Sequence, residues 1–179
     1  TTGSDTKQSN IRELDLTTGA AKTLNTEPGF YYQPRYSPNG QYVVYIKSGG
    51  GALTGSLNSL YRGIFSTPVS SWTPTKIVNG GEPQFTPDSK RVLYMSGSDL
   101  SKKVMSVGVH GENPREVFNL KYVDSVQLSP DGKHVAFTEL FNAYVAPLPA
   151  FGGSIELNKD TTAIPVTALT KSAGPYLHW

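Results

Sequence analysis

Short runs of alternating hydrophobic and polar residues recur along this chain, and proline, glycine, asparagine and serine separate them. Three segments match column by column when they are aligned on a proline: QPRYSPNGQYVVY (33–45), EPQFTPDSKRVLY (82–94) and SVQLSPDGKHVAF (125–137). Alternation with a period of two predicts β-strands, because successive side chains in a strand point to opposite faces. The three segments begin about 45 residues apart, a period typical of propeller-type repeats.

Each segment has the chemistry of a strand, a tight turn and a second strand. A large apolar residue stands two positions before each proline, and the proline presets the backbone angle φ of the turn. Gly40 and Gly132 then occupy a position that favours a left-handed residue. Ser89 takes that position in the second segment, where a residue other than glycine costs on the order of 1 kcal/mol. The second turn is therefore expected to be looser or of another type.

Two further strand-like runs follow each hairpin, which gives four short strands per unit. Such a unit hides its faces only by stacking on the next unit, as in a β-propeller, whereas sandwich folds rarely repeat one turn sequence in register. The sequence thus predicts an all-β propeller with three complete four-stranded blades, at residues 33–78, 82–118 and 124–168. Partial blade strands are expected at 11–24 and 175–179, and the opening TTGSDTKQSN as a frayed terminus. Because partial blades are expected at both ends, the sequence favours a piece of a larger propeller.

Composition narrows the possible functions. The formal net charge is only +2 and the lysines and arginines are scattered, which argues against nucleic acid as a partner. The chain has no cysteine, so disulfides and thiolate metal sites are excluded. No apolar run approaches the roughly 20 residues that a membrane-spanning helix needs. No cofactor is expected.

Several stretches resemble known proteins. Propeller repeats with SPDG turns resemble the TolB-like family. GFYYQPRYSPNGQYVVYIKSGGGALTG (29–55), FNAYVAPLPAFGG (141–153) and SAGPYLHW (172–179) resemble the N-terminal propeller portion of exported bacterial amidohydrolases. The resemblance implies a metal-dependent barrel domain downstream, and a periplasmic or secreted location. It also implies that the chemistry lies outside this chain, because the His-x-His signature of that barrel has no counterpart here.

Catalytic patterns are not found in the sequence. The histidines are His110, His134 and His178, and none stands two positions from another. A metal site needs three or four converging ligands, so no metal site is predicted. The Gly-x-Ser-x-Gly elbow of serine hydrolases is missing. The glycines of SGGGALTGS (48–56) are not followed by the Lys-Ser/Thr and helix of a phosphate-binding loop, and they predict a loop between strands. The chain itself is therefore not expected to be an enzyme.

Candidate binding residues come from two places. Phe30, Tyr31 and Tyr32 precede the first hairpin on the face where the long loop 48–62 also emerges, and an aromatic trio beside a long loop is a candidate docking surface. The alternative is that these rings simply pack under the loop. His178 and Trp179, on a predicted innermost strand, are the other candidates.

Three functions stay open at this point. The first is a non-catalytic scaffold, lid or interaction surface within a larger amidohydrolase-like enzyme, whose partners are the remainder of the propeller or the hydrolase domain. The second is a free-standing TolB-like protein-binding module of the cell envelope. The third is the gating propeller of a prolyl-oligopeptidase-like serine peptidase. Another copy of the chain is a further possible partner, through edge strands.

Overall fold

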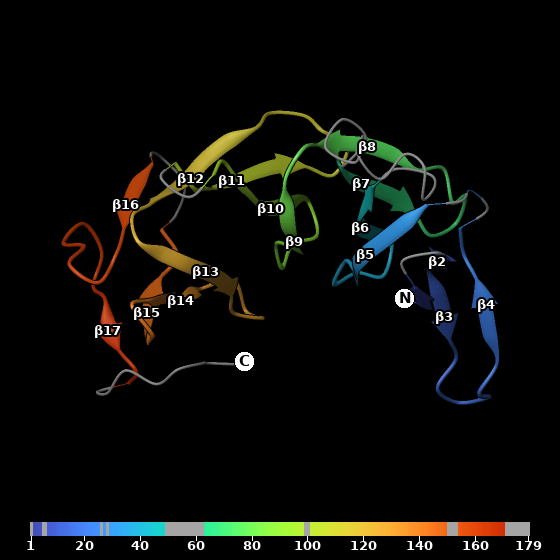
Figure 1. The fold of residues 1–179 in the computed structure, drawn as a ribbon, viewed down its shortest axis with the longest axis horizontal. Coiled ribbons are helices and arrows are strands. Elements are labelled where there is room, and N and C mark those ends of the chain that lie inside the picture. The colour runs from blue at the N-terminus through green and yellow to red at the C-terminus, as the bar shows by residue number, and fades with distance from the viewer. Residues whose placement is uncertain are drawn as a thin grey trace. The chain divides into compact units, whose positions relative to one another are not determined.

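The computed structural model describes residues 2–4, 7–25, 27, 29–48, 63–98, 101–149 and 154–170. Within these ranges all regular structure is β-strand, as predicted (Figure 1). The first strands are β1 (Thr2–Ser4), β2 (Lys7–Asn10), β3 (Arg12–Leu14), β4 (Ala21–Thr23), β5 (Phe30–Tyr36), β6 (Tyr42–Ser48), β7 (Gly63–Pro68) and β8 (Thr75–Val78). They are followed by β9 (Gly81–Phe85), β10 (Arg91–Ser96), β11 (Lys103–Gly108), β12 (Arg115–Leu120), β13 (Val123–Leu128), β14 (His134–Glu139), β15 (Asn142–Pro147), β16 (Ile155–Leu157) and β17 (Thr167–Ala168).

The strands form three larger sheets and two hairpins. The first sheet has the order β5-β6-β7-β8, and the third has the order β13-β14-β15-β17. Every neighbouring pair in these two sheets is antiparallel. The second sheet has the order β16-β12-β11-β10-β9, so it carries a fifth strand that the sequence did not predict. The hairpins β1-β2 and β3-β4 complete the described strands.

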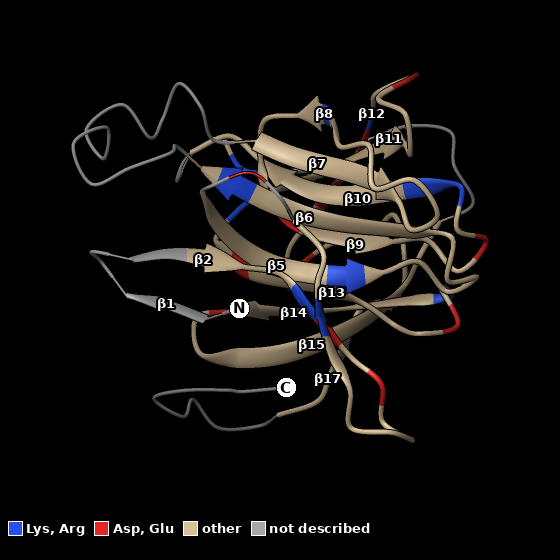
Figure 2. Cartoon of the chain, turned by 90° about the vertical axis from the view of Figure 1, so that its right-hand side faces the viewer, with Lys and Arg blue, Asp and Glu red and all other residues tan. Residues whose placement is uncertain are grey.

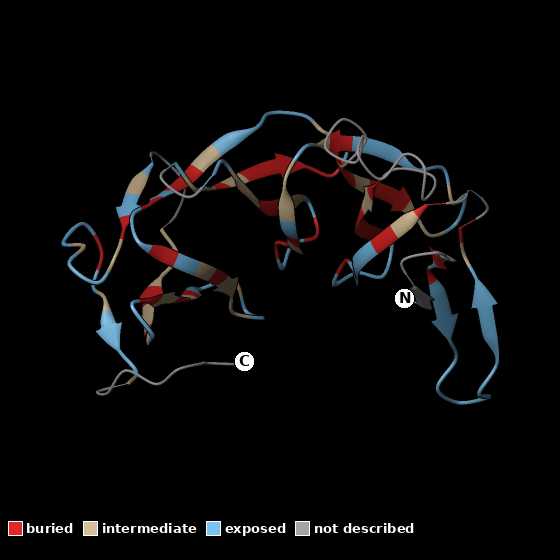
Figure 3. Ribbon diagram, in the orientation of Figure 1, coloured by how far each residue is buried: buried red, intermediate tan, exposed pale blue. Residues whose placement is uncertain are grey.

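The chain divides into two compact units, residues 1–92 with 107–112, and residues 93–106 with 113–179. The core of the first unit gathers Ile11, Tyr31, Val43 and Tyr45. The core of the second unit is larger and includes Val117, Phe118, Leu120, Val135, Phe137 and Leu157. Figure 3 shows the buried residues on the long strands, whereas β3 and β4 are exposed throughout.

One hydrogen-bonded turn occurs three times and explains the repeated sequence. In the third copy the Ser129 hydroxyl donates to Asp131 Oδ1 over 2.6 Å, and Ser129 Oγ accepts the His134 N–H over 3.0 Å. The Lys133 N–H donates to the same Asp131 oxygen over 3.0 Å. These side-chain hydrogen bonds stabilise the turn. They explain why serine or threonine stands before the proline and aspartate or asparagine after it.

The other two copies repeat these bonds. Thr86 donates to Asp88 over 2.6 Å and accepts the Arg91 N–H. Ser37 donates to Asn39 over 2.7 Å and accepts the Tyr42 N–H. The hydroxyl bond is the main cause that lowers the pKa of Asp88 and of Asp131.

The expectation of a looser second turn is wrong. Ser89 has φ 61°, close to φ 71° at Gly40 and φ 67° at Gly132, so all three turns share one conformation. Ser89 is buried, and its Oγ accepts the Asn39 N–H of the first turn over 3.1 Å. This hydrogen bond offsets part of the cost of the left-handed backbone.

The expectation of a frayed N-terminus is also wrong for the described residues. Thr2 pairs with Asn10 and Ser4 with Lys7 in the β1-β2 hairpin. Ser9 then ties β2 to the start of β5: its N–H donates to Gly29 O over 3.0 Å, and its Oγ accepts the Tyr31 N–H over 2.7 Å. Polar residues without periodicity can thus be ordered by side-chain to backbone bonds that a hydrophobic pattern does not reveal.

Candidate functional site

The predicted aromatic trio opens strand β5, and its members differ in environment. Tyr31 is only 2% exposed, its ring lies 5.5 Å from the ring of Tyr45, and its hydroxyl donates to Glu27 O over 2.7 Å. Tyr32 is 47% exposed, and Phe30 is half-buried. The trio is therefore split between core packing at Tyr31 and an accessible ring at Tyr32.

The surroundings of Tyr31 form a packed aromatic cluster. The Tyr45 ring is stacked on Phe65 and on Trp72, with centroids 5.9 and 6.2 Å apart. Burial raises the pKa of Tyr45 to about 12 and also raises the pKa of Tyr31. The Lys47 ammonium lies 5.7 Å from the Tyr31 ring centroid and pairs with Glu27 at 2.5 Å. The Tyr31 hydroxyl, the Tyr45 hydroxyl and the Lys47 ammonium thus have partners at Glu27 O, Thr67 Oγ1 and the Glu27 carboxylate, as is typical of polar groups at the edge of a core.

The remaining sequence candidates form no site within the part of the chain that the structure describes. His178, Trp179 and loop residues 49–62 lie outside the described residues. His134 is exposed at the start of β14, and the His110 ring packs edge-on against Tyr42 with centroids 5.7 Å apart. Among the described residues, no group of three or more His, Cys, Asp or Glu side chains could hold a metal ion. In the same residues no helix is long and apolar enough to cross a membrane.

A different group of residues stands out at one end of the third sheet. Four large apolar side chains are between 55% and 67% exposed there: Tyr122, Leu140, Phe141 and Leu169. Tyr122 immediately precedes β13, Leu140 and Phe141 join β14 to β15, and Leu169 follows β17. We call these four residues the apolar end of the third sheet.

Strand register brings the four residues together. Val123 lies opposite Glu139, and Glu139 lies opposite Asn142, so Tyr122 and the Leu140-Phe141 turn sit at the same end. The Leu169 N–H donates to Ala143 O over 2.8 Å, which places Leu169 beside the start of β15. Strands are about 4.8 Å apart, so the row from β13 to β17 is about 14 Å wide.

Three of these residues have left-handed backbones. Leu140 has φ 47°, Phe141 has φ 66° and Tyr122 has φ 63°. A two-residue hairpin loop with positive φ at both positions is the type I′ turn, which strongly prefers Asn-Gly because bulky residues are strained there. Leucine and phenylalanine are therefore the wrong residues for this turn on conformational grounds.

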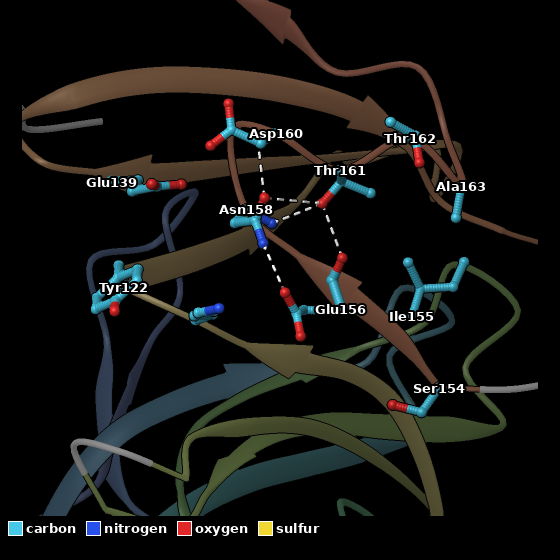
Figure 4. Close-up of a pocket in the computed structure, with 11 residues that line it drawn as sticks. Tyr122, Glu139, Ser154, Ile155, Glu156, Asn158, Asp160, Thr161, Thr162 and Ala163 are labelled. Atoms are coloured by element: carbon cyan, nitrogen blue, oxygen red, sulfur yellow. Dashed lines mark hydrogen bonds between the residues drawn. The ribbon is translucent and has the colours of Figure 1, made fainter.

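A pocket of about 520 Å³ has Tyr122 of the apolar end in its lining (Figure 4). It is lined by residues 121–122, by Glu139 and by residues of the segment 154–163. Glu139 is only 2% exposed, and its Oε2 accepts the Lys159 N–H over 2.6 Å. Asn158 Oδ1 accepts the Asp160 N–H over 2.8 Å, and the Thr161 hydroxyl donates to Glu156 O over 2.8 Å. These bonds hold the wall of the pocket in place.

Only a weak signal for this end is present in the sequence. The strand-like runs HVAFTE and NAYVAP are separated by Leu140 and Phe141 alone. A separation of two residues requires a tight hairpin turn, yet no glycine, asparagine or aspartate stands at either turn position. That mismatch between spacing and residue type was the available clue.

Comparisons with known proteins place the fold. No protein-family model matches the sequence. TolB from Acinetobacter baumannii is similar in structure with a TM-score of 0.58 at 17% identity, and the putative TolB from Agrobacterium tumefaciens has a TM-score of 0.63 at 18% identity. The chain has a TolB-like β-propeller fold.

An oligogalacturonate lyase solved in complex with manganese shares the TolB-like fold, with a TM-score of 0.62 at 15% identity. The alignments cover 84%, 91% and 79% of this chain, but only 40%, 57% and 40% of the A. baumannii TolB, the A. tumefaciens protein and the lyase. The chain thus spans about half the length of these TolB-like structures or less. At such identities the likeness shows the fold alone.

Proposed function

We propose that this chain is a non-catalytic segment of a TolB-like propeller that serves as a scaffold and protein-interaction surface within a larger protein. The observation that supports this most is the apolar end of the third sheet. Large apolar side chains scattered singly on a surface need no explanation, whereas four of them gathered at one end of a sheet are typical of an interaction site.

The larger protein is proposed to be an amidohydrolase-like, metal-dependent hydrolase of the periplasm or the extracellular space. Support for this comes from the sequence resemblance of residues 29–55, 141–153 and 172–179. The partner of the apolar end would then be the hydrolase domain or the remainder of the propeller, and catalysis would belong to that domain.

The experiment begins with the coding sequence downstream of Trp179. A His-x-His motif followed by barrel periodicity is the expected result. The encoded downstream polypeptide, produced separately, should then form a complex with this chain in analytical ultracentrifugation. A stop codon would overturn the proposed parent enzyme in favour of a free-standing module, and a Gly-x-Ser-x-Gly motif would overturn it in favour of a serine peptidase.

A further inference from the structure

We propose that the apolar end of the third sheet binds an extended polypeptide segment that carries apolar side chains beside lysine or arginine. This inference rests on the proposed interaction function and names the chemistry of the partner segment.

The turn at Leu140 and Phe141 is strained, and burial does not compensate for the strain. Leu140 and Phe141 hold left-handed backbones at the tip of the β14-β15 hairpin and are 58% and 61% exposed, so burial in the core does not repay the strain. Asn-Gly at these positions would form the same turn at lower cost. A side chain that strains the backbone and projects into solvent is explained by contact with a partner, because hot spots of interfaces are large apolar or aromatic anchors.

The width of the apolar end matches a short extended peptide segment. The four residues flank the same ends of β13, β14, β15 and β17, and these four strand ends span about 14 Å at 4.8 Å per strand. An extended chain advances about 3.3 Å per residue, so about four residues cross this distance. Alternate side chains of such a segment face the sheet, which supplies two apolar anchors and leaves room for charged neighbours.

The charges that line the adjoining pocket are mainly negative. The carboxylates that line the adjoining pocket are Glu139, Glu156 and Asp160, and Lys121 is its lysine. Asp160 pairs with Lys159 at 2.6 Å, and the Lys121 ammonium lies 5.8 Å from the Tyr122 ring centroid. Because Lys159 neutralises Asp160, the lining keeps Glu139 and Glu156 against Lys121, an excess of one negative charge beside the exposed apolar residues. Electrostatic complementarity therefore favours a partner with basic residues next to its apolar anchors.

The binding experiment compares matched peptides on the whole chain. The first probe is a short peptide of leucine and tryptophan alternating with lysine. In the second peptide glutamate replaces each lysine, and in the third serine replaces each apolar residue. Backbone amide shifts in NMR spectra would report binding, and the expected shifts lie at Tyr122, Leu140, Phe141 and Leu169. Affinity for the lysine peptide should exceed affinity for each of the other two at least tenfold.

Two variants separate a specific site from nonspecific contact. The double variant L140N/F141G keeps the hairpin and removes both anchors, so it should lose at least tenfold in affinity for the lysine peptide. The control is Leu16→Asn in the first unit, because Leu16 is 90% exposed and remote in sequence from the apolar end. Its affinity should equal that of the unmodified chain. Equal binding of the lysine and glutamate peptides, or unchanged binding by L140N/F141G, would overturn the proposal.

The same variants distinguish this inference from the proposed function. If the downstream polypeptide binds L140N/F141G as tightly as the unmodified chain, the interaction function stands and the apolar end is the wrong surface. If it binds neither form, the proposed function fails. Dimerisation of the unmodified chain that increases with concentration and is abolished in L140N/F141G would mean that the occupant is a second copy. This result would also overturn the inference.

Discussion

Ser89 shows how one residue in a repeat can depart from the consensus without changing the fold. Its backbone is left-handed at φ 61°, and its hydroxyl oxygen accepts the Asn39 N–H from the preceding turn. Conformational cost and hydrogen bond oppose each other at this position, and each amounts to about 1 kcal/mol.

Substitutions at Ser89 should separate these two effects. Ser89→Ala keeps the strain and leaves the Asn39 N–H without its partner, so we expect a loss of about 1 to 2 kcal/mol in the free energy of unfolding. Ser89→Gly loses the same bond but relieves the strain, so its loss should be smaller by about 1 kcal/mol. Urea titration of both variants tests the order, and equal stabilities would contradict it.

The turn carboxylates should make stability depend on pH. Hydrogen bonds from Thr86 and Ser129 lower the pKa of Asp88 and of Asp131 in the folded protein. A lowered folded-state pKa adds stability above the unfolded-state pKa of about 4, and this stability is lost as the pH falls through the folded-state value. The protein should therefore lose stability below about pH 4.

Asn39 suggests the matched test of this pH dependence. Asn39 makes the same two bonds with an amide oxygen that does not titrate. The variant D88N/D131N should keep its turns and show a smaller drop in urea midpoint between neutral and acidic pH. A drop as large as that of the unmodified chain would mean that other groups dominate.

At the Leu140-Phe141 turn, stability and binding should change in opposite directions. L140N/F141G relieves strain at two left-handed positions and should raise the free energy of unfolding by about 1 kcal/mol. Thermal unfolding followed by circular dichroism measures this. A decrease would show that the two side chains stabilise the fold.

At the residue scale the sequence predicted the turns well and the strained hairpin poorly. Proline, aspartate and glycine in fixed order specify one turn chemistry, so Gly40 and Gly132 were placed correctly. Leu140 and Phe141 carry no turn signal, because their conformation is imposed by the pairing of Glu139 with Asn142. Tertiary pairing overrode local preference there.

Among the elements, β16 is the one that changes the predicted sheet plan. It leaves the connection between β15 and β17 and pairs in parallel with β12, where Phe118 lies opposite Ile155 and Leu120 lies opposite Leu157. Ser154 also donates to Glu116 through its hydroxyl, and Lys159 donates to Glu139 on β14. The segment thus joins β12 of the second sheet to β14 of the third within one unit.

Leu157 should carry much of the stability that β16 provides. It is fully buried in the core of the second unit, so Leu157→Ala should cost about 3 kcal/mol through lost burial and a residual cavity. Leu16→Ala is the control and should change stability by less than about 0.5 kcal/mol. Comparable urea midpoints for the two variants would show that β16 contributes little.

The positions of the strands could be predicted from the alternation of hydrophobic and polar residues, but the strand that pairs with β16 could not. The large apolar residues two positions before the turn prolines are Tyr36, Phe85 and Leu128, and they are the last residues of β5, β9 and β13. The residues Ile-Glu-Leu of β16 are too few to show a period, and nothing in them selects the edge of β12. Pairing between distant segments depends on the assembled sheets.

On the scale of the whole molecule, the net charge of +2 does not point to a partner, unlike the local acidic excess at the pocket beside Tyr122. Lysine, arginine, aspartate and glutamate are scattered over the strands and loops that the structure describes (Figure 2). An exposed sheet edge is a second feature that could bind another chain. β8 is the outermost strand of the first sheet, and Thr75 and Lys76 on it are exposed. An outermost strand offers unpaired backbone groups to another chain.

We therefore expect the purified chain to associate with further copies through edge strands. Light scattering should show association that increases with concentration, and Thr75→Lys should weaken any association through β8, because lysine on an edge strand disfavours pairing. A monomer at every concentration would contradict this expectation.

The parallel pairing of β16 with β12 has a consequence for how this repeat array can be altered. A repeat that donates a strand to its predecessor cannot be deleted, duplicated or exchanged by itself, since each such change leaves Phe118 and Leu120 facing water or confronts them with a foreign strand. Recombination of these modules, in evolution or in the laboratory, should succeed only when the second and third repeats travel as a pair.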